Sequence, residues 1–176
     1  MLEIILGVIV TISILMFIFV LFNNKFQLAI IKIDKAEEDI SMYLQKKEEL
    51  LGRAKPIIQK EIKKKDILLD LDMIEVEATN FSKHLTLKKI YNELFKLLDE
   101  NEKLFKSKSL QGILEELNQN EEDIVGSIRF YNDTVVDFNH LVLSFPSNLI
   151  AFIRRYKKRD FYNNEKRESF EILNEH

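Results

Sequence analysis

The sequence predicts an all-α protein in which an N-terminal transmembrane helix is followed by an antiparallel bundle of about four long helices. The 176 residues include only four Gly and two Pro, whereas average usage would give roughly 21 of these turn-forming residues. So few breakers exclude the many tight turns of a sandwich, a barrel or a doubly wound sheet. In addition, the N-terminal region is a long uncharged run, and apolar residues recur at helical spacing along the remainder.

The uncharged run from Ile4 to Phe22 is long enough to cross the hydrocarbon core of a bilayer, which is about 30 Å thick. A cleaved signal peptide would begin with basic residues and end at small ones. This chain has Glu3 before the run and no basic residue there, and FNNKF follows it. We therefore expect an uncleaved membrane anchor over residues 1–23.

The orientation of the anchor is predicted from the basic residues that flank it. Lys25, Lys32 and Lys35 follow the apolar run, and none precedes it. This bias favours an N-terminus outside the cell and a cytoplasmic body, although the opposite orientation remains the alternative.

The helical bundle is predicted over residues 24–160. The first helix continues from the membrane as far as Gly52 and Pro56, a second runs over 56–83, and a third covers 86–106 with Thr86 as its cap. A long fourth helix over 109–143 starts at the N-cap Ser109. The first helix has an apolar stripe of Phe26, Ile30, Ile33, Ile40, Leu44 and Leu51.

After the fourth helix, Phe145 and Pro146 turn the chain, and Ser147 or Asn148 caps a short last helix toward Tyr156. Residues 161–176 are expected to form a polar tail. Because helices joined by short connections alternate in direction, this exit segment is expected to return to the bilayer.

An apolar stretch followed by a basic cluster makes the exit segment a candidate for the membrane interface. Basic side chains gain about 1 kcal/mol each near anionic lipid, and aromatic side chains favour the interface. The alternative is that the apolar part closes the bundle core and that the charges are solvated. The candidates are Arg154, Arg155, Lys157, Lys158, Arg159, Phe152 and Tyr156.

The sequence lacks the patterns that catalysis requires: it has no glycine-rich phosphate loop, no nucleophile elbow and no histidine-centred triad. Asp137 and His140 share one helical face, but a di-iron bundle needs two such pairs and further Glu residues. The acidic DLDMIEVE segment (70–77) lacks a calcium loop, and the lysines of KEIKKKD (60–66) lack interleaved aromatics. We expect no enzyme activity, no cofactor or metal, and no nucleic-acid partner.

Residues 129–151, RFYNDTVVDFNHLVLSFPSNLIA, resemble the C-terminal signature of the LemA family, approximately R-x-Y-N-x-x-V-x-D-[YF]-N followed by F-P-S-N-L-I-A. The stretch after the anchor, NKFQLAIIKIDKAEEDISMYLQKKEELL, also resembles the family. The chain departs from the pattern at Glu37, Gly52 and Arg53, and after Ala151. The signature positions that match are Arg129, Tyr131, Asn132, Val135, Asp137, Phe138, Asn139, Phe145, Pro146, Ser147, Asn148, Leu149, Ile150 and Ala151.

This resemblance implies a bacterial single-pass membrane protein with a cytoplasmic antiparallel helical domain, and it supplies no catalytic residues. In the signature, Tyr131, Asn132, Asp137 and Asn139 are expected to form a polar network within or beside the bundle, because a buried hydroxyl or amide needs a partner. A surface binding site at the same residues is the alternative.

Together, these observations predict a LemA-like, membrane-anchored structural or interaction module that is not an enzyme. The lipid bilayer is one partner, and a second copy or another membrane protein is the other, since the apolar stripe has the spacing of a coiled-coil seam. The alternative function is lipid sensing or membrane remodelling through the apolar and basic segment 141–159.

Overall fold

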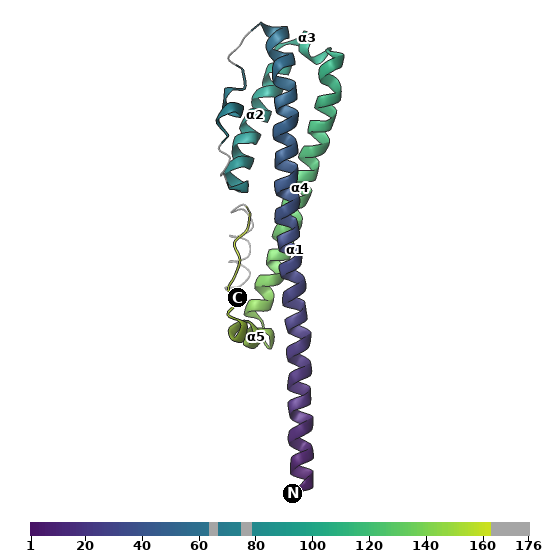
Figure 1. Ribbon diagram of the computed structural model, residues 1–176, viewed down its shortest axis with the longest axis vertical. Coiled ribbons are helices and arrows are strands. Elements are labelled where there is room, and N and C mark those ends of the chain that lie inside the picture. The colour runs from purple at the N-terminus through teal and green to yellow at the C-terminus, as the bar shows by residue number, and fades with distance from the viewer. Residues whose placement is uncertain (64–66, 75–78, 163–176) are drawn as a thin grey trace. The chain divides into compact units, whose positions relative to one another are not determined.

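The computed structural model describes residues 1–63, 67–74 and 79–162, and this part of the chain is helical without any strand. The all-α prediction is therefore confirmed. The elements, shown in Figure 1, are α1 (Leu2–Ile62), the 3₁₀ helix η1 (Leu69–Met73), α2 (Asn80–Glu100), α3 (Glu102–Phe105), α4 (Lys108–Leu143) and α5 (Ser147–Arg154).

The chain divides into two compact units. The terminal unit combines Met1–Ala36 with Arg129–His176, and the central unit is Glu37–Ile128. Helices α1 and α4 each contribute one part to either unit.

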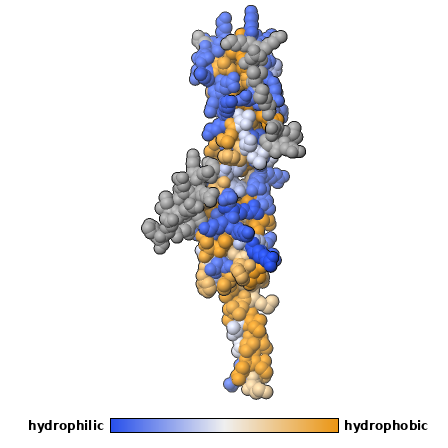
Figure 2. Space-filling view, turned by 90° about the vertical axis from the view of Figure 1, so that its left-hand side faces the viewer, coloured by the Kyte–Doolittle hydropathy of each residue, from blue (hydrophilic) through white to orange (hydrophobic). Residues whose placement is uncertain are grey.

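Within the described chain, α1 alone is long and apolar enough to cross a membrane. Helices α4 and α5 pass the same test only when they are taken together, and they are bent by 94°. The apolar side chains at the start of α1 are exposed, and Figure 2 shows them as a continuous hydrophobic surface at the N-terminal end. This exposure is what a lipid-facing helix requires, because apolar surface is stable only when it is removed from water.

Helix α1 does not end at Gly52 and Pro56, as the sequence predicts, but continues to Ile62 with Pro56 inside it. A proline in a helix removes one hydrogen bond and crowds the carbonyl four residues earlier, which here belongs to Gly52. The packing of Leu51, Ala54 and Ile58, all fully buried, outweighs this local cost.

The predicted second helix over 56–83 is wrong. Its described residues form the end of α1, then η1, and then the first residues of α2; residues 64–66 and 75–78 lie outside the described part. Leu68 precedes η1 in the left-handed region, with φ of 54°, and is completely buried. Burial of this side chain offsets the strain of roughly 1–2 kcal/mol that a non-glycine residue incurs there.

Helix α2 consequently runs parallel to α1. Asn80 donates to the carbonyl of Glu37, and Tyr91, eleven residues later, lies beneath the Lys47 ammonium. The predicted cap Thr86 lies inside α2; Thr79 caps the helix instead and accepts from the Ser82 N–H at 3.2 Å. At the other end, α2 stops at Glu100, and the short α3 completes the predicted third helix.

Helix α4 starts at Lys108, so Ser109 lies inside it instead of capping it, and it continues through Gly112 and Gly126. It runs antiparallel to α1 in the central unit, where Asn120 donates to Tyr43 O and Arg53 pairs with Glu116 at 3.6 Å. Three long helices thus build this unit's core. Its buried side chains include Ile40, Leu44, Leu51 and Ile58 of α1, Leu87, Ile90, Leu94 and Leu98 of α2, and Leu110, Leu117 and Ile124 of α4.

Candidate functional site

The candidate site is the corner between α4 and α5 in the terminal unit. Helix α4 ends at Leu143, and α5 begins at Ser147 after a turn in which the Phe145–Pro146 peptide bond is cis. Pro146 occupies the N-cap without a side-chain cap hydrogen bond, so neither Ser147 nor Asn148 caps α5 as predicted. The Ser147 hydroxyl instead donates to Ser144 O at 2.8 Å and fastens the turn.

Helix α5 has two different faces. Ile150 and Ala151 are buried, so part of the apolar segment closes the core of this unit, as one of the two sequence interpretations holds. The other face is open, with Phe152 84% exposed and Leu149 and Ile153 exposed beside it, and Phe145 in the preceding turn is 80% exposed. The corner therefore combines a core contact with an exposed apolar surface.

The chain leaves α5 at Arg155, which adopts the left-handed conformation that commonly ends a helix, with φ of 57°. The next residue, Tyr156, turns back toward α1 and α4. Its hydroxyl accepts from Gln27 Nε2 at 2.8 Å, and its ring packs on Phe26 and Phe138 at centroid distances of 4.9 and 6.0 Å. Tyr156 thus belongs to an aromatic cluster between the two helices.

Three side chains of α4 hold the backbone of the segment that follows α5. Asn139 donates to Arg159 O at 2.9 Å and accepts from Arg159 N at 2.8 Å. Asn132 accepts from Tyr162 N at 2.9 Å, and the Tyr131 hydroxyl donates to Asp160 O at 3.2 Å. All three side chains are buried. We call Tyr131, Asn132 and Asn139 the backbone clamp.

The clamp explains most of the predicted polar network, with one correction: Asp137 is exposed and lies outside it. The side chain of Arg159 is also held, 3.7 Å from Asp34 and with its guanidinium 5.9 Å from the Phe138 ring centre. At the end of the described segment, Tyr162 packs edge-on against Tyr131, and burial raises the pKa of its phenol. The clamp therefore fixes residues 159–162 along α4.

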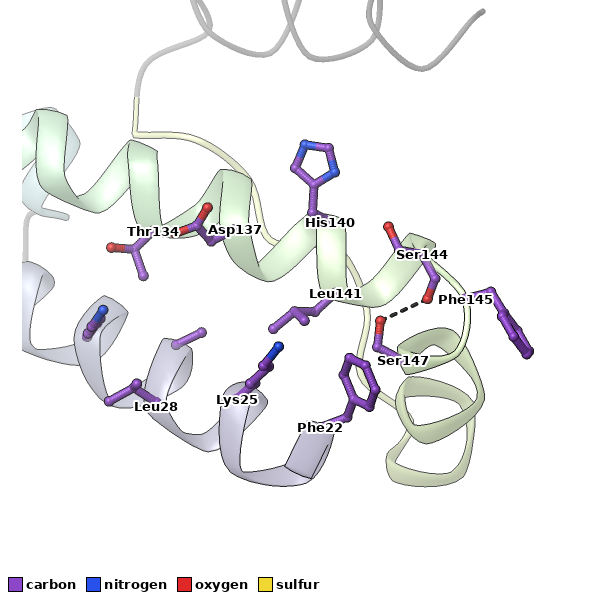
Figure 3. A pocket seen from close by; sticks show the side chains of 12 residues that line it. Phe22, Lys25, Leu28, Thr134, Asp137, His140, Leu141, Ser144, Phe145 and Ser147 are labelled. Atoms are coloured by element: carbon purple, nitrogen blue, oxygen red, sulfur yellow. Dashed lines mark hydrogen bonds between the residues drawn. The ribbon is translucent and has the colours of Figure 1, made fainter. Parts of the chain in front are cut away.

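A groove of about 480 Å³ lies between α1 and α4 beside the corner (Figure 3). Phe22 and Lys25 of α1 point toward Leu141 of α4, whereas the His140 ring points away from α1 and Phe145 points away from the groove. The lining residues are Phe22, Lys25, Leu28, Ala29, Lys32, Thr134, Asp137, His140, Leu141, Ser144, Phe145 and Ser147.

Both the corner and the clamp lie within the range of the chain that matches a known family model. The model of the LemA family matches residues 75–172, which is more than half of the chain. The chain belongs to the LemA family. No curated protein and no solved structure gives a significant match. The matched range contains α2 to α5 and the clamped segment of this LemA-family protein.

The predicted interface residues fall into two groups in the LemA-family structure. Arg154, Arg155, Lys157, Lys158 and Phe152 are exposed, whereas Tyr156 and Arg159 contact α1 and α4 as described above. Whether any of them touches lipid remains a prediction. Of the remaining signature residues, Arg129 is exposed and lies 4.0 Å from Asp133, and Phe138 is buried.

A second polar cluster, which the sequence analysis missed, lies in the central unit. The Lys47 side chain is completely buried, forms an ion pair with Glu121, and places its ammonium 4.5 Å from the centre of the Tyr91 ring. Burial lowers the pKa of Lys47. Burial, together with the positive charge of Lys47, also lowers the pKa of His84. The available signal was the position of Lys47, which continues the apolar stripe of Ile40, Leu44 and Leu51.

The segments considered for metal or nucleic acid contain no ligand cluster in the part that the structure describes. Within residues 1–63, 67–74 and 79–162, no group of three or more His, Asp or Glu side chains is arranged to hold a metal ion. Asp70 and Asp72 pair with Lys89 and Lys55, each at 2.5 Å. Glu75, Glu77 and residues 64–66 of the lysine-rich segment lie outside the described residues.

Proposed function

We propose that this LemA-family protein is a membrane-anchored structural or interaction module without enzymatic activity. It is anchored in a bacterial cell membrane by the first turns of α1, with the N-terminus outside and the helical units in the cytoplasm. The single observation that carries the proposal is the continuity of α1. One helix includes both the exposed apolar run and the buried stripe of the units.

This continuity gives the anchor a mechanical role. A helix without an internal break transmits the position of the membrane segment directly to the residues that pack on α4, beginning with Phe26, which meets Phe138 at 5.7 Å. A flexible linker would lose that coupling. The proposed module therefore holds its surfaces at a fixed distance from the bilayer. A protein that organises other membrane proteins or its own copies requires such a fixed position.

Cysteine labelling in intact cells tests the anchor and its orientation. The chain has no native Cys, so single cysteines beside the N-terminus and at Ser107 report cleanly on an impermeant maleimide. Labelling near the N-terminus but not at Ser107 supports the proposal. The reverse pattern would place the helical units outside the cytoplasm, and recovery of the protein without membranes would contradict the anchor itself.

Partners are tested by crosslinking in native membranes. Leu28 and Ile31, on the part of α1 that follows the apolar run, are 55% and 61% exposed and offer apolar contact area to a second helix. A crosslinked dimer or a specific heterologous adduct supports an interaction module. A monomer at every crosslinker concentration would argue against self-association.

Contact of α5 with the lipid surface is the second candidate function, and it is favoured by the exposed face of that helix. Phe152 and Ile153 are exposed on α5 directly before the exposed Arg154 and Arg155. At an anionic bilayer surface, such apolar side chains can insert between the lipids while the basic side chains bind the charged headgroups. Trypsin should cleave after the basic residues of 154–158 more slowly in nanodiscs with anionic lipid than in zwitterionic nanodiscs. Added salt should remove this difference in cleavage rate. Equal cleavage rates in both lipids would contradict this function.

A further inference from the structure

We propose that the groove between α1 and α4 in the terminal unit binds the headgroup of an anionic phospholipid. The inference rests on the proposed membrane anchor and adds a specific ligand site to it. The site is the groove of about 480 Å³ lined by residues 22–32 of α1 and residues 134–147 at the end of α4 and the start of α5.

The end of the groove at Phe22 and Lys25 matches the depth of lipid headgroups. Phe22 is the last residue of the apolar run and also lines the groove. Lys25 follows three residues later, about 4.5 Å further along the helix axis. The headgroup layer of one leaflet is roughly 5–8 Å thick, so the Lys25 ammonium lies at the level of the lipid phosphates.

The charges of the groove favour an anionic ligand. Its α1 wall has Lys25 and Lys32, two turns apart, and within the described residues neither ammonium has an ion-pair partner. The Lys25 ammonium lies over the face of Phe22, 5.1 Å from the ring centre. On the α4 wall, Asp137 is the single carboxylate of the lining, and a carboxylate can accept a hydrogen bond from a headgroup hydroxyl. The Lys and Asp side chains of the lining thus include one more cation than anions.

The remaining lining suits a lipid better than a free phosphate ion. Phe22, Leu28 and Leu141 supply apolar walls (Figure 3), and Ala29 also lines the groove. A small hydrated anion does not use such apolar surface. Because Phe22 belongs to both the groove and the apolar run, an acyl chain of a lipid seated there can continue along α1 into the bilayer. The structure thus joins a cationic headgroup site to a path for the lipid tail.

Native mass spectrometry of the full-length protein released from nanodiscs tests the site. The nanodiscs contain equal amounts of phosphatidylglycerol and phosphatidylcholine, and the measured quantity is the ratio of the two lipids retained on the protein. We expect about a fivefold preference for phosphatidylglycerol, reduced to near one in the double variant Lys25→Gln, Lys32→Gln.

Two control variants separate the groove from general surface charge. Lys35→Gln removes an exposed cation of α1 outside the groove, and Lys103→Gln with Lys108→Gln removes two exposed cations of the central unit. Both should keep the wild-type ratio. Equal retention of both lipids by the wild type, or an equal loss of preference in the controls, overturns the proposal. Circular dichroism of each variant verifies that the helices are intact.

A competition arm distinguishes a lipid from a soluble phosphate ester. Glycerol phosphate added at millimolar concentration should leave the retained phosphatidylglycerol in place; its displacement would show a site for the headgroup alone and contradict a lipid site. Failure of the underlying anchor has a different signature. In that case the protein would not incorporate into nanodiscs, whereas a failed headgroup site leaves incorporation intact and the lipid ratio at one.

Discussion

Asn139 binds both backbone polar groups of Arg159, donating to its carbonyl at 2.9 Å and accepting from its N–H at 2.8 Å. A single side-chain amide thereby replaces the pair of hydrogen bonds that a neighbouring strand would provide. Because the contact is with the backbone, it places no requirement on the side chain at 159. Asn139 of α4 can therefore hold the exit segment independently of the side-chain sequence of that segment.

Removal of the Asn139 amide should release the clamped segment. In Asn139→Ala, two hydrogen bonds of about 1 kcal/mol each are lost, and the population of the open segment should rise about tenfold or more. Limited trypsin digestion measures this change as faster cleavage after Lys157, Lys158 and Arg159. Asp137→Ala, two residues away at an exposed position, is the matched control and should cleave at the wild-type rate. An unchanged rate in Asn139→Ala would contradict the clamp.

The buried ion pair of the central unit should be sensitive to loss of one partner. In Glu121→Leu the ammonium of Lys47 remains fully buried without its carboxylate, and we expect a loss of about 3 kcal/mol of unfolding free energy. The double variant Lys47→Met, Glu121→Leu should recover most of that loss. Chemical denaturation followed by circular dichroism measures both variants.

A surface pair provides the control for this comparison. Arg53 and Glu116 are 3.6 Å apart, and both side chains are about half exposed, so Glu116→Ala should change stability by less than about 1 kcal/mol. If Glu121→Leu changes stability as little as Glu116→Ala, the buried charge of Lys47 is not stabilised by Glu121.

His84 should make the central unit less stable in mild acid. Its pKa is lowered in the folded chain by burial and by Lys47, so below about pH 6.5 the unfolded chain binds a proton that the folded chain does not. Above that pH, this difference in proton binding does not reduce the free energy of unfolding. As the pH falls below it, the free energy of unfolding declines by at most about 1.4 kcal/mol per pH unit.

Denaturation at pH 7.5 and 5.5 measures this effect of His84. The wild type should lose more stability between the two values than His84→Gln. Lys47, Lys88 and Glu121 face the same imidazole, so the comparison of the two proteins at each pH isolates the histidine. Parallel pH profiles would contradict the assignment.

The sequence predicts the helices whose signals are long and consistent, and it misplaces boundaries where packing outweighs local preference. The stripe of α4 identifies a helix over 109–143, and the structure has it over Lys108–Leu143. Gly52 and Pro56 indicate an end to the first helix, yet buried neighbours continue α1 to Ile62. The direction of α2 was missed because the return from α1 is made partly by the 3₁₀ helix η1.

The candidate site was predictable as a set of residues but not as an arrangement. Asn132 and Asn139 are seven residues apart and therefore share a face of α4, which indicates a common partner. The partner itself, the backbone of 159–162, has no side-chain pattern that could identify it from sequence. Likewise, the groove depends on how α1 and α4 pack in the terminal unit, and Lys25 and Lys32 appear in sequence only as flanking charges.

The depth of Phe152 in the bilayer most directly tests two proposals together: that α1 anchors the protein, and that the exposed face of α5 lies at the lipid surface. A bimane fluorophore on Phe152→Cys in the reconstituted full-length protein is measured with lipids that bear a nitroxide quencher, and Asp133→Cys on α4 is the control. We expect strong quenching at 152 and little at 133. Equally weak quenching at both positions would contradict this expectation.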